Sequence, residues 1–151
     1  MLVVTDSTAL ISLDRIGRLD LLPAVFPDVM APPAVIEEFG QHPAWLTVRS
    51  PRDTETTRTV RAQLDAGEAE AIALALEHPG STLLLDEQRG RAYALTLGVP
   101  VVGTFGLLIR AKRRGLLSTV RPVLDALVGA GFYASDALYH RALALAGEAE
   151  P

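Results

Sequence analysis

The feature that most constrains how this chain can fold is an alternation of short apolar runs with segments of helical pattern. Apolar runs at 2–5, 28–31, 82–85 and 99–102 predict buried strands, because a strand that is covered on both faces is apolar at consecutive positions. Helical segments separate these runs, and strands joined by helical crossovers pair in parallel. We therefore predict an α/β fold in which helices cover both faces of a mainly parallel sheet.

The expected helices are recognised by their residue types and by their ends. Residues 67–78 are rich in alanine, leucine and glutamate, and the following Pro-Gly pair stops the segment. Ser7 and Thr8 are candidate N-caps of the first helix, and Thr104 is the candidate N-cap of a later one. Residues 42–50 are expected to hold an irregular or edge strand. The expected helices span 9–16, 34–39, 67–78, 89–97, 105–114, 121–128 and 136–146.

Composition limits the class of protein. The 151 residues, 49% of them hydrophobic, suit one core, so we expect a single domain over 1–147 and a frayed tail over 148–151. The absence of cysteine excludes a disulfide scaffold, a cysteine nucleophile and a cysteine-ligated metal. No apolar run reaches the roughly 18 residues of a membrane helix, and the N-terminus lacks the features of a signal peptide. We therefore expect a cytoplasmic protein without a membrane partner.

Two aspartates stand directly after predicted strands. Asp6 ends the first apolar run, and Asp86 ends the run at 82–85. Parallel α/β sheets bind ligands at the carboxyl ends of their strands, so both side chains are expected at the ligand-binding edge. Either aspartate, considered alone, fits equally well as a helix cap.

Two glutamates extend this group of acids. Glu68 lies on the helix face that is otherwise small and apolar and should pack on the sheet, whereas Glu70 projects about 160° away around the helix. In the segment PPAVIEEF, Glu38 shares a face with Val35, three residues earlier, and Glu37 points elsewhere. Glu68 also suits a helix N-terminus, and Glu38 alone would be a solvated carboxylate. The presence of the other acids favours an inward position for Glu68 and Glu38, with Glu70 and Glu37 as the alternatives.

Four converging carboxylates need compensation for their charge. Two carboxylates about 5 Å apart repel each other by about 3 kcal/mol at an effective dielectric constant of about 20. Protonation or a divalent cation relieves this repulsion, and oxygen ligands without cysteine suit Mg²⁺ or Mn²⁺. A metal held in this way polarises a phosphoryl oxygen and activates water, so the predicted chemistry is phosphodiester hydrolysis.

Substrate phosphates need positive charge near such a site, although the net charge of the chain is −4. Arg89 and Arg91 follow Asp86 closely and are the predicted phosphate ligands. The basic residues within 110–114 end a helix, where cations commonly interact with the helix dipole. This structural role is favoured for them over contact with the substrate. The apolar residues of 121–146 are expected in the core, with an oligomer or partner interface as the alternative.

Several segments together resemble one known family. TDSTALI, PPAVIEEF, GEAEAIALA and LLLDEQRGRAYALTLGVPVVGTFGLLIRAKRRG are similar to the PIN-domain superfamily of metal-dependent ribonucleases, and most of all to a prokaryotic branch near the VapC toxins. The resemblance extends to GFYASDALYHRAL and so covers nearly the whole chain. It implies a three-layer α/β/α domain with a central, mainly parallel sheet of four or five strands.

The resemblance also implies a site. Asp6, Glu38, Glu68 and Asp86 correspond to the family's acids, which bind Mg²⁺ or Mn²⁺ and cut single-stranded RNA. Glu68 stands where VapC toxins usually have aspartate, and the longer side chain moves the carboxylate by about one methylene. Ser7 corresponds to a small hydroxyl residue beside the first acid and is expected to hydrogen-bond a ligand carboxylate, with helix capping as its alternative role.

The partners implied by the resemblance are single-stranded RNA, a second copy of the chain in a homodimer and, for the toxin of a toxin–antitoxin pair, a cognate antitoxin protein. The alternative function is a non-catalytic PIN-like module that binds RNA or protein. The glutamate at the third acid position and the acidic composition keep this alternative open.

Overall fold

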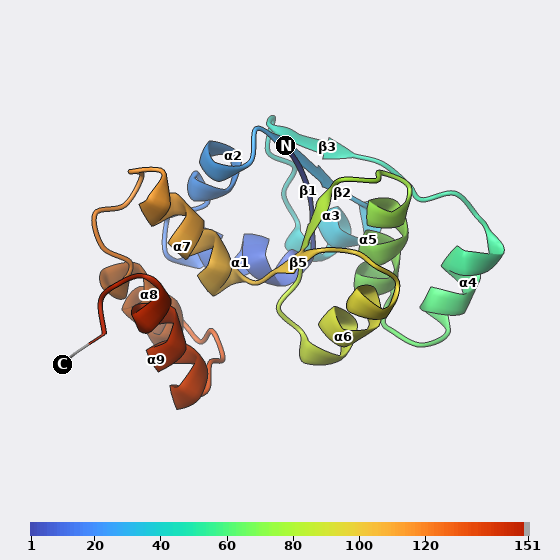
Figure 1. Ribbon diagram of the computed structural model, residues 1–151. Helices are drawn as coiled ribbons and strands as arrows, with labels where there is room; N and C mark the ends of the chain where they lie inside the picture. The colour runs from blue at the N-terminus through green and yellow to red at the C-terminus, as the bar shows by residue number, and fades with distance from the viewer. Residues whose placement is uncertain (150–151) are drawn as a thin grey trace.

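A five-stranded sheet forms the centre of the fold. The computed structural model describes residues 1–149 and shows all five strands parallel, in the order β3-β2-β1-β4-β5 (Figure 1). The strands are β1 (Leu2–Thr5), β2 (Asp28–Ala31), β3 (Leu46–Val48), β4 (Thr82–Leu84) and β5 (Val101–Val102). The predicted α/β fold, with a mainly parallel sheet of four or five strands, is confirmed.

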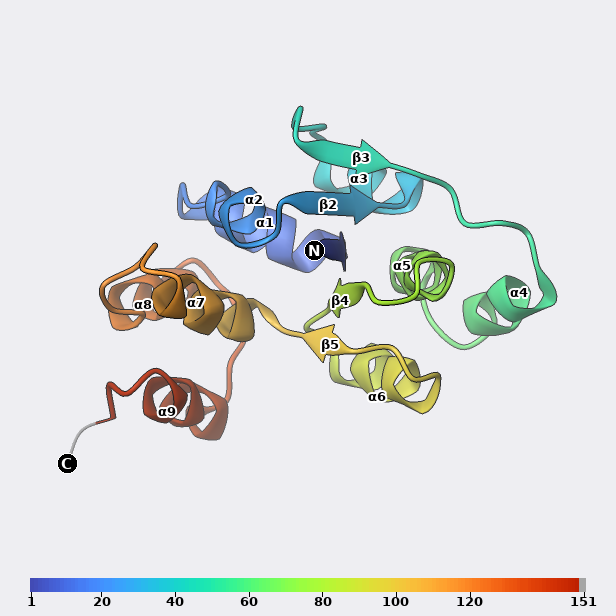
Figure 2. The same ribbon diagram turned by 45° about the horizontal axis from the view of Figure 1, so that its top comes forward.

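Helices form a layer on each side of the sheet. One core contains residues of α1 (Ser7–Arg15), α2 (Leu21–Val25), α3 (Pro33–Phe39), α7 (Thr104–Arg113), α8 (Arg121–Gly129) and α9 (Asp136–Leu145). The other core contains residues of α4 (Glu55–Arg61), α5 (Ala66–Leu76) and α6 (Gln88–Thr96). Figures 1 and 2 both show α4 at one end of the molecule and α8 with α9 at the opposite end.

Alternating strand residues supply the two cores. Val3 and Leu84 belong to the first core, whereas Val4, Leu83 and Leu85 belong to the second, and all five side chains are fully buried. Burying a side chain of this size contributes about 1.5–3 kcal/mol relative to leaving it exposed. The strand segments are therefore apolar at consecutive positions because both faces of the sheet are covered.

The order in which the chain adds strands to the sheet changes direction between the neighbouring strands β1 and β4, although all the strands are parallel. The chain leaves β1 through α1 and reaches β2 on one side, and it leaves β4 through α6 and reaches β5 on the other side. The two helices belong to opposite layers, because Leu10 of α1 lies in the first core and Ala94 of α6 lies in the second. Open α/β sheets bind ligands at such a reversal, outside the carboxyl ends of the strands.

The structure corrects two predicted helix caps. Asp6, rather than Ser7 or Thr8, caps α1, and its side chain accepts a hydrogen bond from the Ala9 N–H. Gly103 holds the N-cap position of α7, which was predicted for Thr104. The Thr104 hydroxyl does not cap α7, because it donates instead to the side chain of Asp86, which follows β4.

The remaining short elements agree with their predictions to different extents. The short helix α2, a single turn that carries Pro23, was not predicted. The polar stretch 51–59 was expected to lie on the surface and to lead into a helix, and α4 begins within it. The strand expected at 99–102 shortens to β5, because the Val99 N–H donates to the Ala94 carbonyl and closes the end of α6. The edge strand expected within 42–50 is present as β3.

The chain end is anchored through Glu148, where the frayed tail was expected to begin. Its carboxylate accepts hydrogen bonds from Lys112 Nζ at 2.9 Å, from the Val120 N–H at 2.8 Å and from the Arg121 N–H at 3.1 Å. The packed chain therefore continues to residue 148. Residues 150 and 151 of the predicted tail lie outside the described residues. No helix within residues 1–149 is long and apolar enough to cross a membrane.

Candidate functional site

Asp6 is the most deeply buried acid at the reversal between β1 and β4. It follows β1 directly, and its backbone N–H donates to the Leu84 carbonyl of β4 at 3.1 Å. Its side chain is the N-cap of α1 and accepts from the Ala9 N–H at 3.3 Å, and the residue is only 4% exposed. Asp6 therefore caps α1 and also lies at the carboxyl end of β1.

Asp86 lies two residues beyond β4 and is fixed by the first residue of α7. The Thr104 N–H donates to one carboxylate oxygen at 2.8 Å, and the Thr104 hydroxyl donates to the other at 2.5 Å. A Cβ at Gly103 would lie 3.0 Å from Asp86 Oδ1 and 2.7 Å from Arg91 Nη1. Glycine at this position therefore lets the start of α7 approach the acid closely.

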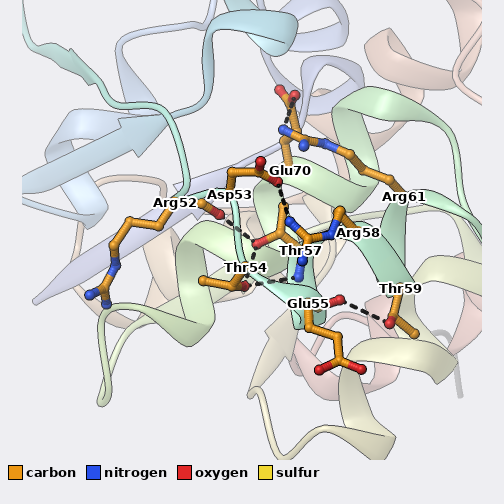
Figure 3. Close-up of polar contacts among 9 residues, drawn as sticks. All are labelled: Arg52, Asp53, Thr54, Glu55, Thr57, Arg58, Thr59, Arg61 and Glu70. Atoms are coloured by element: carbon orange, nitrogen blue, oxygen red, sulfur yellow. Dashed lines mark hydrogen bonds and ion pairs between the residues drawn. The ribbon is translucent and has the colours of Figure 1, made fainter.

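Glu68 reaches the site from the first turn of α5. Asp65 caps this helix by accepting from the Glu68 N–H at 3.0 Å. Glu68 Oε2 lies 3.2 Å from the position of a Cβ on Gly90, so its carboxylate lies against the start of α6. Glu70, the alternative acid, instead forms an ion pair with Arg61 of α4 at 2.9 Å (Figure 3). The structure therefore brings Glu68 into the site, and not Glu70.

Glu38 lies on the exposed rim of the site. Its carboxylate belongs to α3, and Oε2 lies 3.9 Å from the position of a Cβ on Gly67, at the start of α5. Its charge contributes to the raised pKa of Glu68. Glu37 and Glu38 both line a shallow pocket of about 400 Å³ together with Asp65. Glu38 therefore acts electrostatically on Glu68 from the rim.

The protonation behaviour of three acids shows that their charges interact. Burial raises the pKa of Asp6 well above its ordinary value, and the charges of Asp86 and Glu68 add to this effect, while the Ala9 and Asp86 N–H groups oppose it. Burial also raises the pKa of Asp86, against the opposing effects of Thr104 and Arg91. The three acids therefore resist becoming fully ionised together.

Glu68 combines a raised pKa with a side chain that remains partly accessible to solvent. Burial, followed by the charges of Asp65, Glu87 and Glu38, raises the pKa of Glu68 from 4.5 to about 7, and Arg89 opposes the increase. A carboxyl group with this pKa is partly protonated at neutral pH. A cation bound beside it would restore its ionised form.

The donor chemistry of the cluster fits a hard divalent cation, because every candidate ligand is a carboxylate oxygen and the charges lack full compensation. Across residues 1–149, however, the side chains as placed do not form a group of three or more His, Asp or Glu ligands that could hold a metal ion. Binding of a cation by these acids would therefore require their side chains to move closer together.

The two predicted phosphate ligands differ in their surroundings. Arg89 is exposed and acts electrostatically on Glu68. Arg91 donates to the Leu85 carbonyl at 3.0 Å and its charge lowers the pKa of Asp86, so it also supports the loop that carries this acid. Ser7 is buried beside Asp6, and within the described part of the chain its hydroxyl makes no hydrogen bond to an acid of the site.

The basic end of α7 has structural partners instead. Arg110 lies over the ring of Phe26, with 5.3 Å between the guanidinium carbon and the ring centroid. Lys112 binds Glu148, and Arg114 donates to the Val25 carbonyl. These contacts agree with the structural role that the sequence favoured for the basic residues of 110–114.

Sequence reasoning missed the residues that position the acids. Thr104 fixes Asp86, while Asp65 and Glu87 cap α5 and α6 on either side of Glu68. The signal for Thr104 was present in the VVGT segment, where a hydroxyl residue follows a strand. Its contact with Asp86 depends on the pairing of β4 with β5, which no local pattern records.

Comparison with known proteins extends these observations. A family model described as a PIN domain matches residues 2–148, which is nearly the whole chain. No curated protein matches the sequence significantly.

Proposed function

Since the chain belongs to the PIN-domain family, whose members are generally nucleases, we propose that it is a divalent-metal-dependent ribonuclease that hydrolyses phosphodiester bonds of single-stranded RNA. The observation that carries this proposal is the group of mutually repelling acids at the reversal between β1 and β4. Nucleases of this family typically use divalent metal ions, and such an ion would compensate the excess negative charge.

In this proposal Asp6, Glu38, Glu68 and Asp86 hold Mg²⁺ or Mn²⁺ and form the catalytic group. A bound divalent cation supplies Lewis-acid polarisation of the scissile phosphate and a more acidic water. Water adds to phosphorus, the P–O bond to one ribose breaks, and the products are a phosphate monoester and a free hydroxyl group.

The protein's own groups orient this reaction. The two Thr104 donors fix both oxygens of Asp86, and the Ala9 N–H fixes Asp6 at the start of α1. Arg89 and Arg91 supply the positive charge that faces the substrate phosphates. Glu68, which is partly protonated without a cation, is able to accept or release a proton near neutral pH.

The proposal is tested by incubating the purified chain with mixed single-stranded RNA oligonucleotides and Mn²⁺ or Mg²⁺. We expect cleavage that EDTA abolishes and that Asp6→Asn and Glu68→Gln abolish without unfolding the protein. Glu70→Gln is the matched control, because Glu70 lies on the same helix but binds Arg61, and this variant should cleave like the original chain. Cleavage that persists in EDTA or in Asp6→Asn would contradict the proposal.

A non-catalytic module that binds RNA or protein is the second candidate. The observation that favours it is the lack of a preformed metal-binding group within residues 1–149. Such a module would retain RNA binding in Asp6→Asn and would show no cleavage with any divalent metal.

The biological setting forms a further part of the proposal. The likeness to VapC toxins supports a cytoplasmic toxin that forms a homodimer and pairs with an antitoxin protein. Growth arrest on expression of the chain, relieved by Asp6→Asn, would support the toxin role. Normal growth with full cleavage activity in the same cells would contradict it.

A further inference from the structure

A second, larger groove begins at the candidate site and continues across α7 to α9. Its volume is about 910 Å³. Its lining includes Asp86, Arg91, Phe132, Tyr133 and Arg141. Because Asp86 belongs to both the groove and the acid cluster, a ligand chain in the site can continue into the groove without a break.

Tyr133 is the most unusual side chain in this groove. It is aromatic but 88% exposed, and within residues 1–149 it takes part in no hydrogen bond or ring contact. Its neighbour Phe132 stacks on Phe105, with ring centroids 5.2 Å apart, and Ser135 caps α9 by accepting from the Leu138 N–H. The backbone on both sides of Tyr133 is therefore anchored, and a ring displayed on an anchored loop loses little conformational freedom when a ligand binds it.

The groove also carries positive charge. Arg141 is exposed, and it forms no ion pair with any of the described residues. Arg91 also lines the groove. A guanidinium group binds a phosphodiester through paired hydrogen bonds, so the groove combines two phosphate-binding groups with an exposed aromatic ring.

Resting on the proposed ribonuclease function, we propose that this groove binds the RNA segment next to the cleaved bond, with Tyr133 stacking on an unpaired base and Arg141 contacting a phosphate. Single-stranded nucleic acids are bound in this way, because every base offers a flat face and every linkage carries a negative charge. The adjoining acid cluster contributes phosphodiester chemistry at one end of the groove. The lining also includes Glu87 and several apolar residues, so the case for RNA as the occupant rests on the continuity of the groove with the acid cluster, on the exposed ring of Tyr133 and on Arg141.

The test measures RNA binding separately from cleavage. Single-stranded RNA octamers that carry a fluorescein label, or one 2-aminopurine at successive positions, are titrated with the full chain in EDTA. We expect Tyr133→Ala to weaken binding by about fivefold or more and to abolish the quenching of 2-aminopurine at one position. Tyr133→Phe should bind within about twofold of the original chain, because the ring is retained.

The substitutions of Tyr133 and Arg141 each have a control substitution on the surface outside the groove. Leu95→Ala removes a side chain that is 61% exposed on α6, outside the groove, and should change neither signal. Arg141→Gln should lower the salt dependence of RNA binding by about 0.7 in the logarithmic slope, the contribution of one phosphate contact to a single strand. Arg15→Gln, at the far end of α1, should leave the slope unchanged.

Unchanged affinity and quenching in Tyr133→Ala, in a chain that still cleaves RNA with Mn²⁺, would overturn this inference and leave the ribonuclease proposal standing. Failure of the original chain to bind or cleave any octamer would overturn both. Light scattering covers the protein alternative: a dimer that Tyr133→Ala converts to monomer, with unchanged RNA affinity, would identify the groove as an interface between copies and overturn the inference.

Discussion

Glu68 and Glu148 are both partly buried glutamates, yet the structure treats their charges in opposite ways. Burial and three neighbouring carboxylates raise the pKa of Glu68 to about 7. Burial acts on Glu148 as well, but the Val120 N–H, Lys112 and the Arg121 N–H outweigh it and lower the pKa of Glu148. The difference shows that the fold can satisfy a buried carboxylate where the acid has a structural role, and that it leaves the acids at the sheet edge without such compensation.

This contrast separates two roles for negative charge. The Glu148 carboxylate completes the contacts between α7, α8 and the chain end with groups that the protein supplies itself. The acid cluster of Asp6, Glu68 and Asp86 has fewer donors than its charge requires, so its compensation must come from protons or from a ligand. Uncompensated acids at a ligand-binding edge are typical of functional sites.

The largest expected effect is on RNA cleavage, where substitution of Asp86 should differ most from substitution of Glu148. We expect Asp86→Asn to lower RNA cleavage with Mn²⁺ by at least about 100-fold, because the loss of a supporting group alone costs 10–100-fold at a metal site. Glu148→Gln should cleave within a few-fold of the original chain at a temperature where it is folded. Initial cleavage rates of the two purified variants test this prediction. A comparable loss of cleavage in both variants would contradict separate roles for Asp86 and Glu148.

A second substitution tests how firmly Asp86 must be held. Thr104→Val removes the hydroxyl that donates to Asp86 at 2.5 Å and retains the backbone donor. We expect Mn²⁺ affinity to fall by about tenfold, as for other groups that support a metal ligand. Thr59→Val is the matched control, because the Thr59 hydroxyl donates to the Glu55 carbonyl on exposed α4 (Figure 3). Equal affinities in the two variants would refute a positioning role for Thr104.

Substitution of Glu148 should lower the free energy of unfolding, whereas substitution of Asp6 should leave it unchanged or raise it. Glu148→Ala leaves partly buried donors without an acceptor, and we expect it to lower the free energy of unfolding by about 1–3 kcal/mol. Asp6→Asn should be neutral or stabilising in EDTA, because it removes one of the repelling charges. Urea denaturation of both variants measures these changes. A strongly destabilising Asp6→Asn would mean that the fold depends on the ionised acid.

The smallest effect concerns pH. Because the folded-state pKa of Glu68 lies above its ordinary value, the folded chain binds more protons than the unfolded chain between pH 4.5 and about 7. Stability in EDTA should therefore decrease as the pH rises through this window. The lowered pKa of Glu148 acts in the reverse direction, so its contribution is lost as the pH falls below about 4.5. Melting curves from pH 3 to 8 measure both slopes, and the upper slope should become shallower in Glu68→Gln, in which only Asp6 and Asp86 of the acid cluster still have raised pKa values.

Much of the fold was predictable because its determinants are local. The strand runs are apolar at consecutive positions, and Asp6 and Asp86 follow them directly in the sequence. The helical phase of α5 also separated Glu68 from Glu70, and in the structure Glu70 forms an ion pair with Arg61 of α4. These features follow from the periods of strands and helices, which the sequence displays.

The remaining features depend on contacts between distant segments. The bond from Thr104 to Asp86 joins residues 18 positions apart, and the anchoring of Glu148 joins segments 27 to 36 positions apart. The exposure of Tyr133 follows from the placement of α9, which no local pattern reveals. Such features are set by the packing of whole elements, so a single sequence predicts the acids better than it predicts the groups that position them.

The contrast between the two acidic regions is tested most directly by titrating Mn²⁺ into the metal-free chain and following the loss of the free-ion signal by electron paramagnetic resonance. We expect saturable binding in the original chain and in Glu148→Gln, and loss of this binding in Asp6→Asn and Asp86→Asn. Binding that survives both aspartate substitutions, or its absence from the original chain, would contradict a cation site at the acid cluster.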